Sequence, residues 1–138
     1  MALQYSEALR NAQLDTVEST IGTSAILELW SGSEPADADT ADGAGDILCS
    51  ITLPSDWMAA ASGGSKAKSG TWSGTGTSAA GTGTDVTYFR LTESGGTVHM
   101  QGTVTATGGG GDMTVDNVSI AESQTVVVST FTLTAGNA

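Results

Sequence analysis

Residues 86–105, VTYFRLTESGGTVHMQGTVT, decide the fold of this chain. Two β-prone runs flank Ser94-Gly95-Gly96, a pattern typical of a β-hairpin. Four further glycines, Gly108 to Gly111, predict a tight turn or a place where two backbones approach closely. The run TVVVSTFTLT at 125–134 is long, apolar and uncharged, so as an exposed edge it would promote aggregation. We therefore expect this run at the centre of a sheet or paired across a subunit interface.

Shorter strands are expected on both sides of this hairpin, because apolar and polar residues alternate there. They are residues 25–30, 47–53, a weak strand at 66–73, and short strands around Met113, Val115, Val118 and Ile120. Residues 74–84 are predicted to be a flexible loop tip. The pattern predicts an all-β fold, an antiparallel jelly-roll-like β-sandwich over residues 23–138, preceded by an N-terminal arm and helix over residues 1–22.

The helix is expected at residues 6–21, SEALRNAQLDTVESTI. Ser6 is a good N-cap, and Gly22 suits the position that ends a helix. Leu14, Val17 and Ile21 recur with helical spacing, and so do Tyr5, Leu9 and Ala12. Such a helix is marginal alone and must dock. It docks either on its own domain or, as an arm, on a neighbouring subunit.

The segment PSDWMAAA, which follows the second strand, is predicted to form a short helical turn capped by Ser55. It carries Trp57, one of the few large side chains in a chain dominated by Gly, Thr, Ser and Ala. Trp57 is either a core residue beneath the sandwich or an interface anchor, since tryptophan is enriched at contact hot spots.

The charge balance excludes several partners. The formal net charge is −11, with only four lysines and arginines. We therefore expect no nucleic-acid binding and no anionic membrane surface as partner. The chain contains no apolar run long enough for a transmembrane helix, and its first residues do not resemble a signal peptide. Synthesis in a cytoplasm is expected.

The residues that carry chemistry elsewhere give no catalytic pattern here. The acidic loop at 31–46 fails the EF-hand register, which leaves a solvated loop or a calcium site of another kind. His99 lies on a strand with no acidic partner at useful spacing, and Cys49 alternates with apolar residues as a core residue does. Gly108 to Gly111 are not followed by the residues of a phosphate loop. We expect no enzyme, no catalytic residues, no metal and no cofactor.

Four stretches resemble a family of small structural proteins of tailed bacteriophages. They are ALQYSEALRNAQLDTVESTIGTSAILEL at 2–29, LPSDWMAAA at 53–61, GTVTATGGGGDMTVDNVSI at 102–120 and TFTLTAGNA at 130–138. Such proteins are similar to head decoration or cement proteins, built as a jelly roll. The resemblance implies a protein that binds the outside of a capsid and has no catalytic residues.

On this resemblance, the expected partners are the major capsid protein and further copies of the same chain, as a dimer or trimer on the outer surface of the virion. The capsid or oligomer interface is expected at Tyr5, Leu9, Leu14, Val17 and Trp57. Two alternatives stay open. One is another virion part, such as a tail, collar or fibre-base protein. The other is a glycan-binding β-sandwich, with Trp30 beside the acidic loop as its platform.

Overall fold

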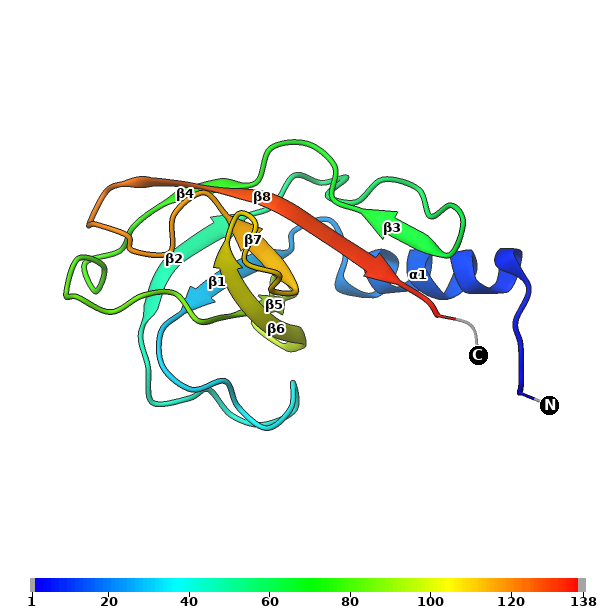
Figure 1. Ribbon diagram of the computed structural model, residues 1–138, viewed down its shortest axis with the longest axis horizontal. Helices are drawn as coiled ribbons and strands as arrows, with labels where there is room; N and C mark the ends of the chain where they lie inside the picture. The colour runs from blue at the N-terminus through cyan, green and yellow to red at the C-terminus, as the bar shows by residue number, and fades with distance from the viewer. Residues whose placement is uncertain (1, 137–138) are drawn as a thin grey trace.

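A computed structural model describes residues 2–136 and shows a mostly β protein with one helix (Figure 1). Its elements are α1 (Glu7–Ile21), β1 (Ile26–Trp30), β2 (Ile47–Thr52), β3 (Ser65–Ala67), β4 (Ser73–Thr75), β5 (Tyr88–Thr92), β6 (Val98–Ala106), β7 (Met113–Val115) and β8 (Thr125–Thr134). The predicted helix is confirmed together with its caps. Ser6 accepts a hydrogen bond from the Leu9 N–H, and Gly22 ends the helix at φ 89°.

The strands form one curled sheet in the order β2-β1-β5-β6-β7-β8-β3. β4 pairs with β8 and reaches β2 through a bridge between Cys49 and Gly76, so the sheet curls into a partly closed barrel (Figure 1). All pairs are antiparallel except β6 with β7, which is parallel. The sheet is therefore mixed, which corrects the expectation of a purely antiparallel arrangement.

The β5–β6 hairpin forms as predicted. Its strands pair antiparallel from Tyr88 opposite Thr103 to Thr92 opposite Val98. The turn between them needs a glycine, because Gly96 has a φ of 93°, which side chains with a Cβ rarely adopt. Residue patterning and turn chemistry agree here, which is why the sequence sufficed to place the hairpin.

The glycine run allows the parallel pair. Only residues 107–112 connect β6 to β7, far fewer than an ordinary crossover between parallel strands needs. The loop therefore curls back tightly on Thr105. A Cβ on Gly109 would lie 2.7 Å from the Cβ of Thr105, and a Cβ on Gly111 would lie 3.0 Å from the Thr105 nitrogen. The predicted close approach of two backbones is confirmed.

Strand β8 lies centrally, as expected for its composition. β7 pairs with one side of it, and β4 and β3 pair successively with the other. The core of the molecule lies against it, where aromatic rings contact one another in a row. Trp57 contacts Trp72, Trp72 contacts Phe131, and Phe131 meets Phe89 edge to face, with centroid distances of 6.0, 5.7 and 5.6 Å.

Several local predictions are wrong. No strand forms around Val118 and Ile120, and the weak strand expected at 66–73 is replaced by two separate strands, β3 and β4. Residues 53–61 form no helical turn, because Trp57 is drawn into the core, where its indole N–H donates to the Gly22 carbonyl. Residues 74–84 are more than a loop tip. They begin with the end of β4, and Ala80 is buried in the core cluster. Small residues in this segment allow the close backbone contacts that complete the curled sheet.

Candidate interaction surface

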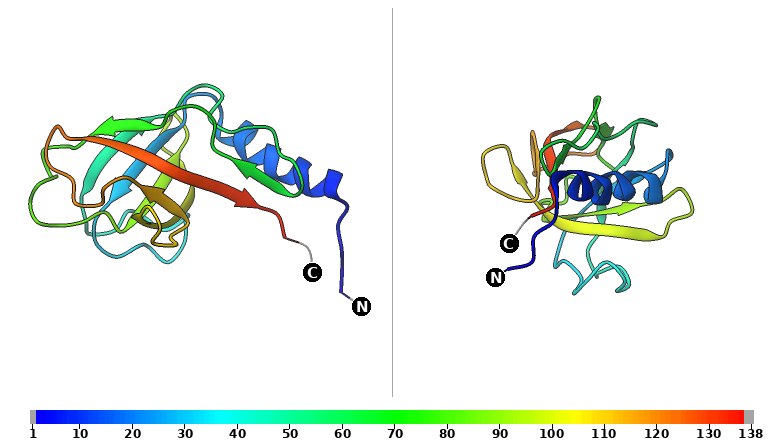
Figure 2. Two further views of the ribbon diagram at one scale, coloured as in Figure 1. Left: turned by 45° about the horizontal axis from the view of Figure 1, so that its top comes forward. Right: turned by 90° about the vertical axis from the view of Figure 1, so that its right-hand side faces the viewer.

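The exposed apolar side chains gather at one end of the molecule. Among residues 2–136, the large hydrophobic side chains classed as exposed are Leu3, Tyr5 and Leu9, at 73%, 40% and 46% of their full area. All three belong to the N-terminal segment and the first turn of α1. Figure 2 shows this end of α1 projecting from the barrel, and Arg10 on it donates a hydrogen bond to the Ala135 carbonyl just after β8.

The structure separates the five predicted interface residues into three groups by exposure. Tyr5 and Leu9 lie on the surface, and Val17 is half-buried against the core. Leu14 and Trp57 are buried, and Trp57 has no exposed area. Helical spacing identified the apolar positions of α1 but could not say which of them face the protein's own core. Trp57 offers no surface in this conformation, so its contacts are with its own chain.

Helix α1 is fixed to the loop before β3 by polar side chains along one face. Four of these side chains accept hydrogen bonds from backbone N–H groups of residues 58–64, at 2.9–3.1 Å. The pairs are Glu7 with Gly63, Asn11 with Gly64, Asp15 with Ala61, and Glu18 with Met58. The exposed apolar end is therefore carried on a rigidly held helix.

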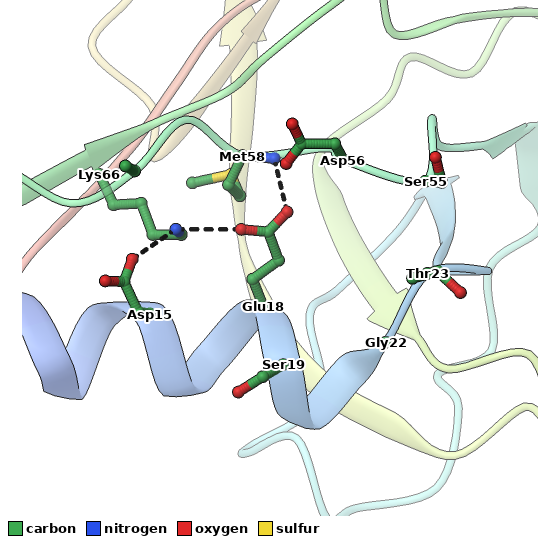
Figure 3. A pocket seen from close by; sticks show the side chains of 10 residues that line it. Asp15, Glu18, Ser19, Gly22, Thr23, Ser55, Asp56, Met58 and Lys66 are labelled. Atoms are coloured by element: carbon green, nitrogen blue, oxygen red, sulfur yellow. Dashed lines mark hydrogen bonds and ion pairs between the residues drawn. The ribbon is translucent and has the colours of Figure 1, made fainter.

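Lys66 of β3 adds two ion pairs to this contact between α1 and the loop (Figure 3). Its ammonium is 2.7 Å from Asp15 Oδ1 and 3.0 Å from Glu18 Oε2, and it also donates to the Ala59 carbonyl. The Lys66 side chain is only 3% exposed. Burial disfavours its charged form, but the hydrogen bonds and charges of the two carboxylates outweigh burial and raise the pKa of Lys66.

A cleft of about 540 Å³ opens beside this group, between the end of α1 and residues 55–60. Asp56 and Ser55 line its far wall (Figure 3). Because Lys66 is held protonated between two carboxylates, it is a poor nucleophile and a poor base. The arrangement binds α1 to the barrel and offers no catalytic chemistry of its own.

Acid will weaken this attachment through Asp15. The hydrogen bond from Lys66, and then that from the Ala61 N–H, hold the pKa of Asp15 below its ordinary value. A carboxyl whose folded pKa is lowered stabilises the fold above its unfolded pKa, and this stabilisation is lost as pH falls through the folded pKa. We expect Asp15→Asn to be less stable than the wild type at pH 7. The difference should shrink as the pH falls below the unfolded pKa of an aspartate, about 4, and through the lowered folded pKa of Asp15.

Urea unfolding of both proteins from pH 7 to pH 2 will measure this difference. Asp39→Asn, in the acidic loop and away from α1, is the control and should track the wild type at every pH. A gap between Asp15→Asn and the wild type that stays constant down to pH 2 would contradict the assignment.

The acidic loop between β1 and β2 is held by a buried arginine that the sequence did not reveal. Arg90 on β5 is 1% exposed, and its Nη1 forms an ion pair with Asp42 at 2.6 Å. Its Nη2 donates to the carbonyls of Ala38 and Thr40 at 2.9 and 2.7 Å. The loop is therefore pinned over the outer face of the sheet, although many of its own side chains are exposed.

Trp30 lies in the layer beneath this loop. It stacks on Tyr88 at 6.0 Å between centroids, and its indole N–H donates to Glu28. Burial raises the pKa of Glu28, while the hydrogen bond from Trp30 opposes that shift. Trp30 is only 6% exposed. It therefore provides no open aromatic platform for a sugar ring.

The surroundings of the remaining candidate residues, Cys49 and His99, indicate structural roles. Cys49 is fully buried, and burial raises the pKa of its thiol to about 11, so it stays protonated and unreactive. His99 is partly exposed, and the hairpin brings Glu93 to 3.5 Å from its Nε2, a partner that sequence spacing did not indicate. Within the described residues, no three His, Cys, Asp or Glu side chains are grouped closely enough to hold a metal ion.

Comparison with known proteins finds no matching family model, no matching curated protein and no matching solved structure. Within residues 2–136, no helix combines the length and the apolarity that crossing a membrane requires.

Proposed function

We propose that this chain is a capsid decoration, or cement, protein of a tailed bacteriophage. In this role it binds the outer face of the shell of major capsid protein and stabilises the head. The observation that carries the proposal is the exposed apolar end of the molecule: Leu9 lies on the first turn of α1, which polar contacts hold rigidly, and Leu3 and Tyr5 lie in the segment before it. A rigid apolar projection binds a partner with little loss of conformational freedom.

The charge of the chain supports an outer location. At −11, the protein is repelled by packaged DNA, so it has no affinity for the interior of a filled head. Adhesion needs no catalytic group, and the polar clusters around Lys66 and Arg90 serve to fix α1 and the acidic loop. The jelly-roll topology stays a prediction, and the proposal depends only on the β-rich fold and its projecting helix.

The position of this chain on the particle would distinguish a decoration protein from a tail, collar or fibre-base protein. A decoration protein covers the shell in many copies, whereas a tail or collar protein is confined to one vertex. A glycan-binding role gains no support, because Trp30, Trp57 and Trp72 are all buried.

The shell contact predicts a specific loss on Leu9→Ser. Burying the exposed half of a leucine contributes about 1 kcal/mol, which is about fivefold in affinity for each copy. Binding to empty shells of major capsid protein, measured by co-sedimentation, should fall by about that factor. Gln13→Ser, one turn further along the exposed side of α1, is the matched control and should bind like the wild type.

Two results would contradict the proposal. One is undiminished shell binding by Leu9→Ser. The other is a particle reconstruction in which this chain is absent from the exterior of the head.

A further inference from the structure

The sheet contains a gap one strand wide. β7 spans only three residues between the longer strands β6 and β8. β7 begins at Met113, so residues 98–103 of β6 and residues 132–134 of β8 have no β7 between them. Among the strands that the structure describes, this part of β6 pairs only with β5, and this part of β8 pairs only with β3. Because β7 separates them there, β6 and β8 lie about 10 Å apart where the gap begins. This is the width that one additional strand requires.

On the β6 side, backbone groups point into the gap. The Val104 N–H donates to the Thr87 carbonyl on the side of β5, so its neighbour Thr103 faces the other way. The Thr103 N–H is taken by the Asp112 carboxylate at 2.9 Å, which closes this end of the gap. Continuing the alternation along the strand, the backbone of Gln101 also faces the gap.

On the β8 side the same alternation applies. The Phe131 carbonyl accepts from the Lys68 N–H, and the Ala135 N–H donates to the Gly64 carbonyl, so these residues face β3. Thr132 and Thr134 therefore present their backbone N–H and C=O groups to the gap. Unpaired strand edges of this kind bind extended segments of other chains.

A hollow of about 470 Å³ occupies the gap. Phe89 and Phe131, both buried, form part of its lining, and Met100 and Leu133 line its sides. An extended segment placed here would therefore find backbone partners along both edges and an apolar surface for alternate side chains.

The charge of the chain indicates which segment occupies the gap. Two copies of a chain with a net charge of −11 repel each other, so a contact between them is least opposed where both segments are uncharged. Strands β6 and β8 contain no Asp, Glu, Lys or Arg, and neither does the arm at residues 2–6. In the arm, the apolar residues Leu3 and Tyr5 alternate with Gln4 and Ser6, as in a strand with one apolar face.

We propose that the arm of one copy, residues 2–6, adds as a strand in the gap between β6 and β8 of a second copy. The contact joins two different surfaces of the chain, and it closes when the copies are related by a two-fold or three-fold axis, as a dimer or trimer in which each copy donates one arm and accepts another. The arm starts at the outer end of α1, on the side away from the barrel of its own chain, which favours exchange between copies (Figures 1 and 2). This inference rests on the proposed function and deepens it: it assigns Leu3 and Tyr5 to the contact between decorating copies and leaves Leu9 on the first turn of α1 for the contact with the shell.

Light scattering coupled to size exclusion tests the inference without any capsid. The full chain should have two or three times the mass of the monomer, and deletion of residues 1–5 should give the monomer with an unchanged circular dichroism spectrum. Leu3→Asp should also dissociate the assembly, whereas Leu3→Val, the matched control, should not. A monomeric full chain, or an assembly that survives the deletion, would overturn the proposal.

Disulfide trapping tests the placement. Gln4→Cys and Thr132→Cys are made in separate chains, because Gln4 alternates with Leu3 and would lie on the exposed face of the sheet, where Thr132 also lies. The native Cys49 stays silent because it is buried. After mixing and mild oxidation, a cross-linked pair containing one chain of each kind should form at least tenfold faster than with Thr82→Cys, on a distant loop, as the second partner. Equal rates for the two would overturn the placement. Leu9 lies outside the exchanged segment, so failure of the shell-binding experiment would leave these results unchanged.

Discussion

Trp57→Ala will lower the free energy of unfolding by about 3–5 kcal/mol, the largest loss that we expect from a single side chain. Trp57 is completely buried, contacts Trp72, and donates its indole N–H to the Gly22 carbonyl at the end of α1. Alanine would leave a large cavity and an unpaired carbonyl at the junction between helix and barrel. Urea unfolding followed by circular dichroism measures the loss.

Trp57→Phe separates a core role from an interface role. Phenylalanine retains much of the ring volume and loses only the indole hydrogen bond, so we expect a smaller loss, about 1–3 kcal/mol, and a folded protein at 25 °C. Because Trp57 has no exposed area, the folded fraction of Trp57→Phe should bind shells like the wild type. If a fully folded Trp57→Phe protein bound shells more weakly than the wild type, Trp57 would belong to the interface after all.

The parts of the fold that the sequence predicts well are those set by local chemistry. The caps of α1, the turn at Gly96 and the glycine run each depend on a few adjacent residues whose backbone conformation is restricted. The central position of β8 follows from its uncharged apolar composition. In each case a local preference and the final structure agree, as expected for sequences that specify one fold.

The parts that could not be predicted depend on contacts between distant residues. The parallel pairing of β6 and β7 has no local signal, since a glycine run also suits an ordinary antiparallel turn. The ion pairs of Lys66 with Asp15 and of Arg90 with Asp42 join residues about fifty positions apart. Charged residues are usually exposed, so composition alone could not indicate that these two cations are buried.

The candidate surface was predictable only in outline. Helical spacing placed Leu9 and Leu14 in apolar series on α1, but the structure exposes Leu9 and buries Leu14. The difference arises because the first turns of α1 extend beyond the barrel, while Leu14 and Ile21 reach it (Figure 1). Only the path of the helix relative to the sheet, which sequence patterns do not encode, decides between them.

Arg90→Met will release the acidic loop and destabilise the protein by about 3 kcal/mol, the lower end of the range for breaking a buried ion pair. The lower end applies because Asp42 is 57% exposed and can be solvated by water once the guanidinium is gone. Two loop carbonyls, those of Ala38 and Thr40, lose their donor at the same time. Hydrogen exchange should show faster exchange across residues 34–46, and proteases should cut there first.

Two further variants show which part of Arg90 matters. Arg90→Lys keeps the charge but not the planar set of donors, so it should recover only part of the lost stability. Asp42→Asn leaves both carbonyl hydrogen bonds in place, and the amide oxygen can still accept from Nη1, but the buried guanidinium loses its paired charge, so we expect a smaller loss, about 1–2 kcal/mol. If Asp42→Asn lowered the free energy of unfolding as much as Arg90→Met does, the ion pair and not the two carbonyl hydrogen bonds would hold the loop. If Arg90→Met left loop exchange unchanged, the loop would be held by its contacts with Ser31 and Gln101 instead.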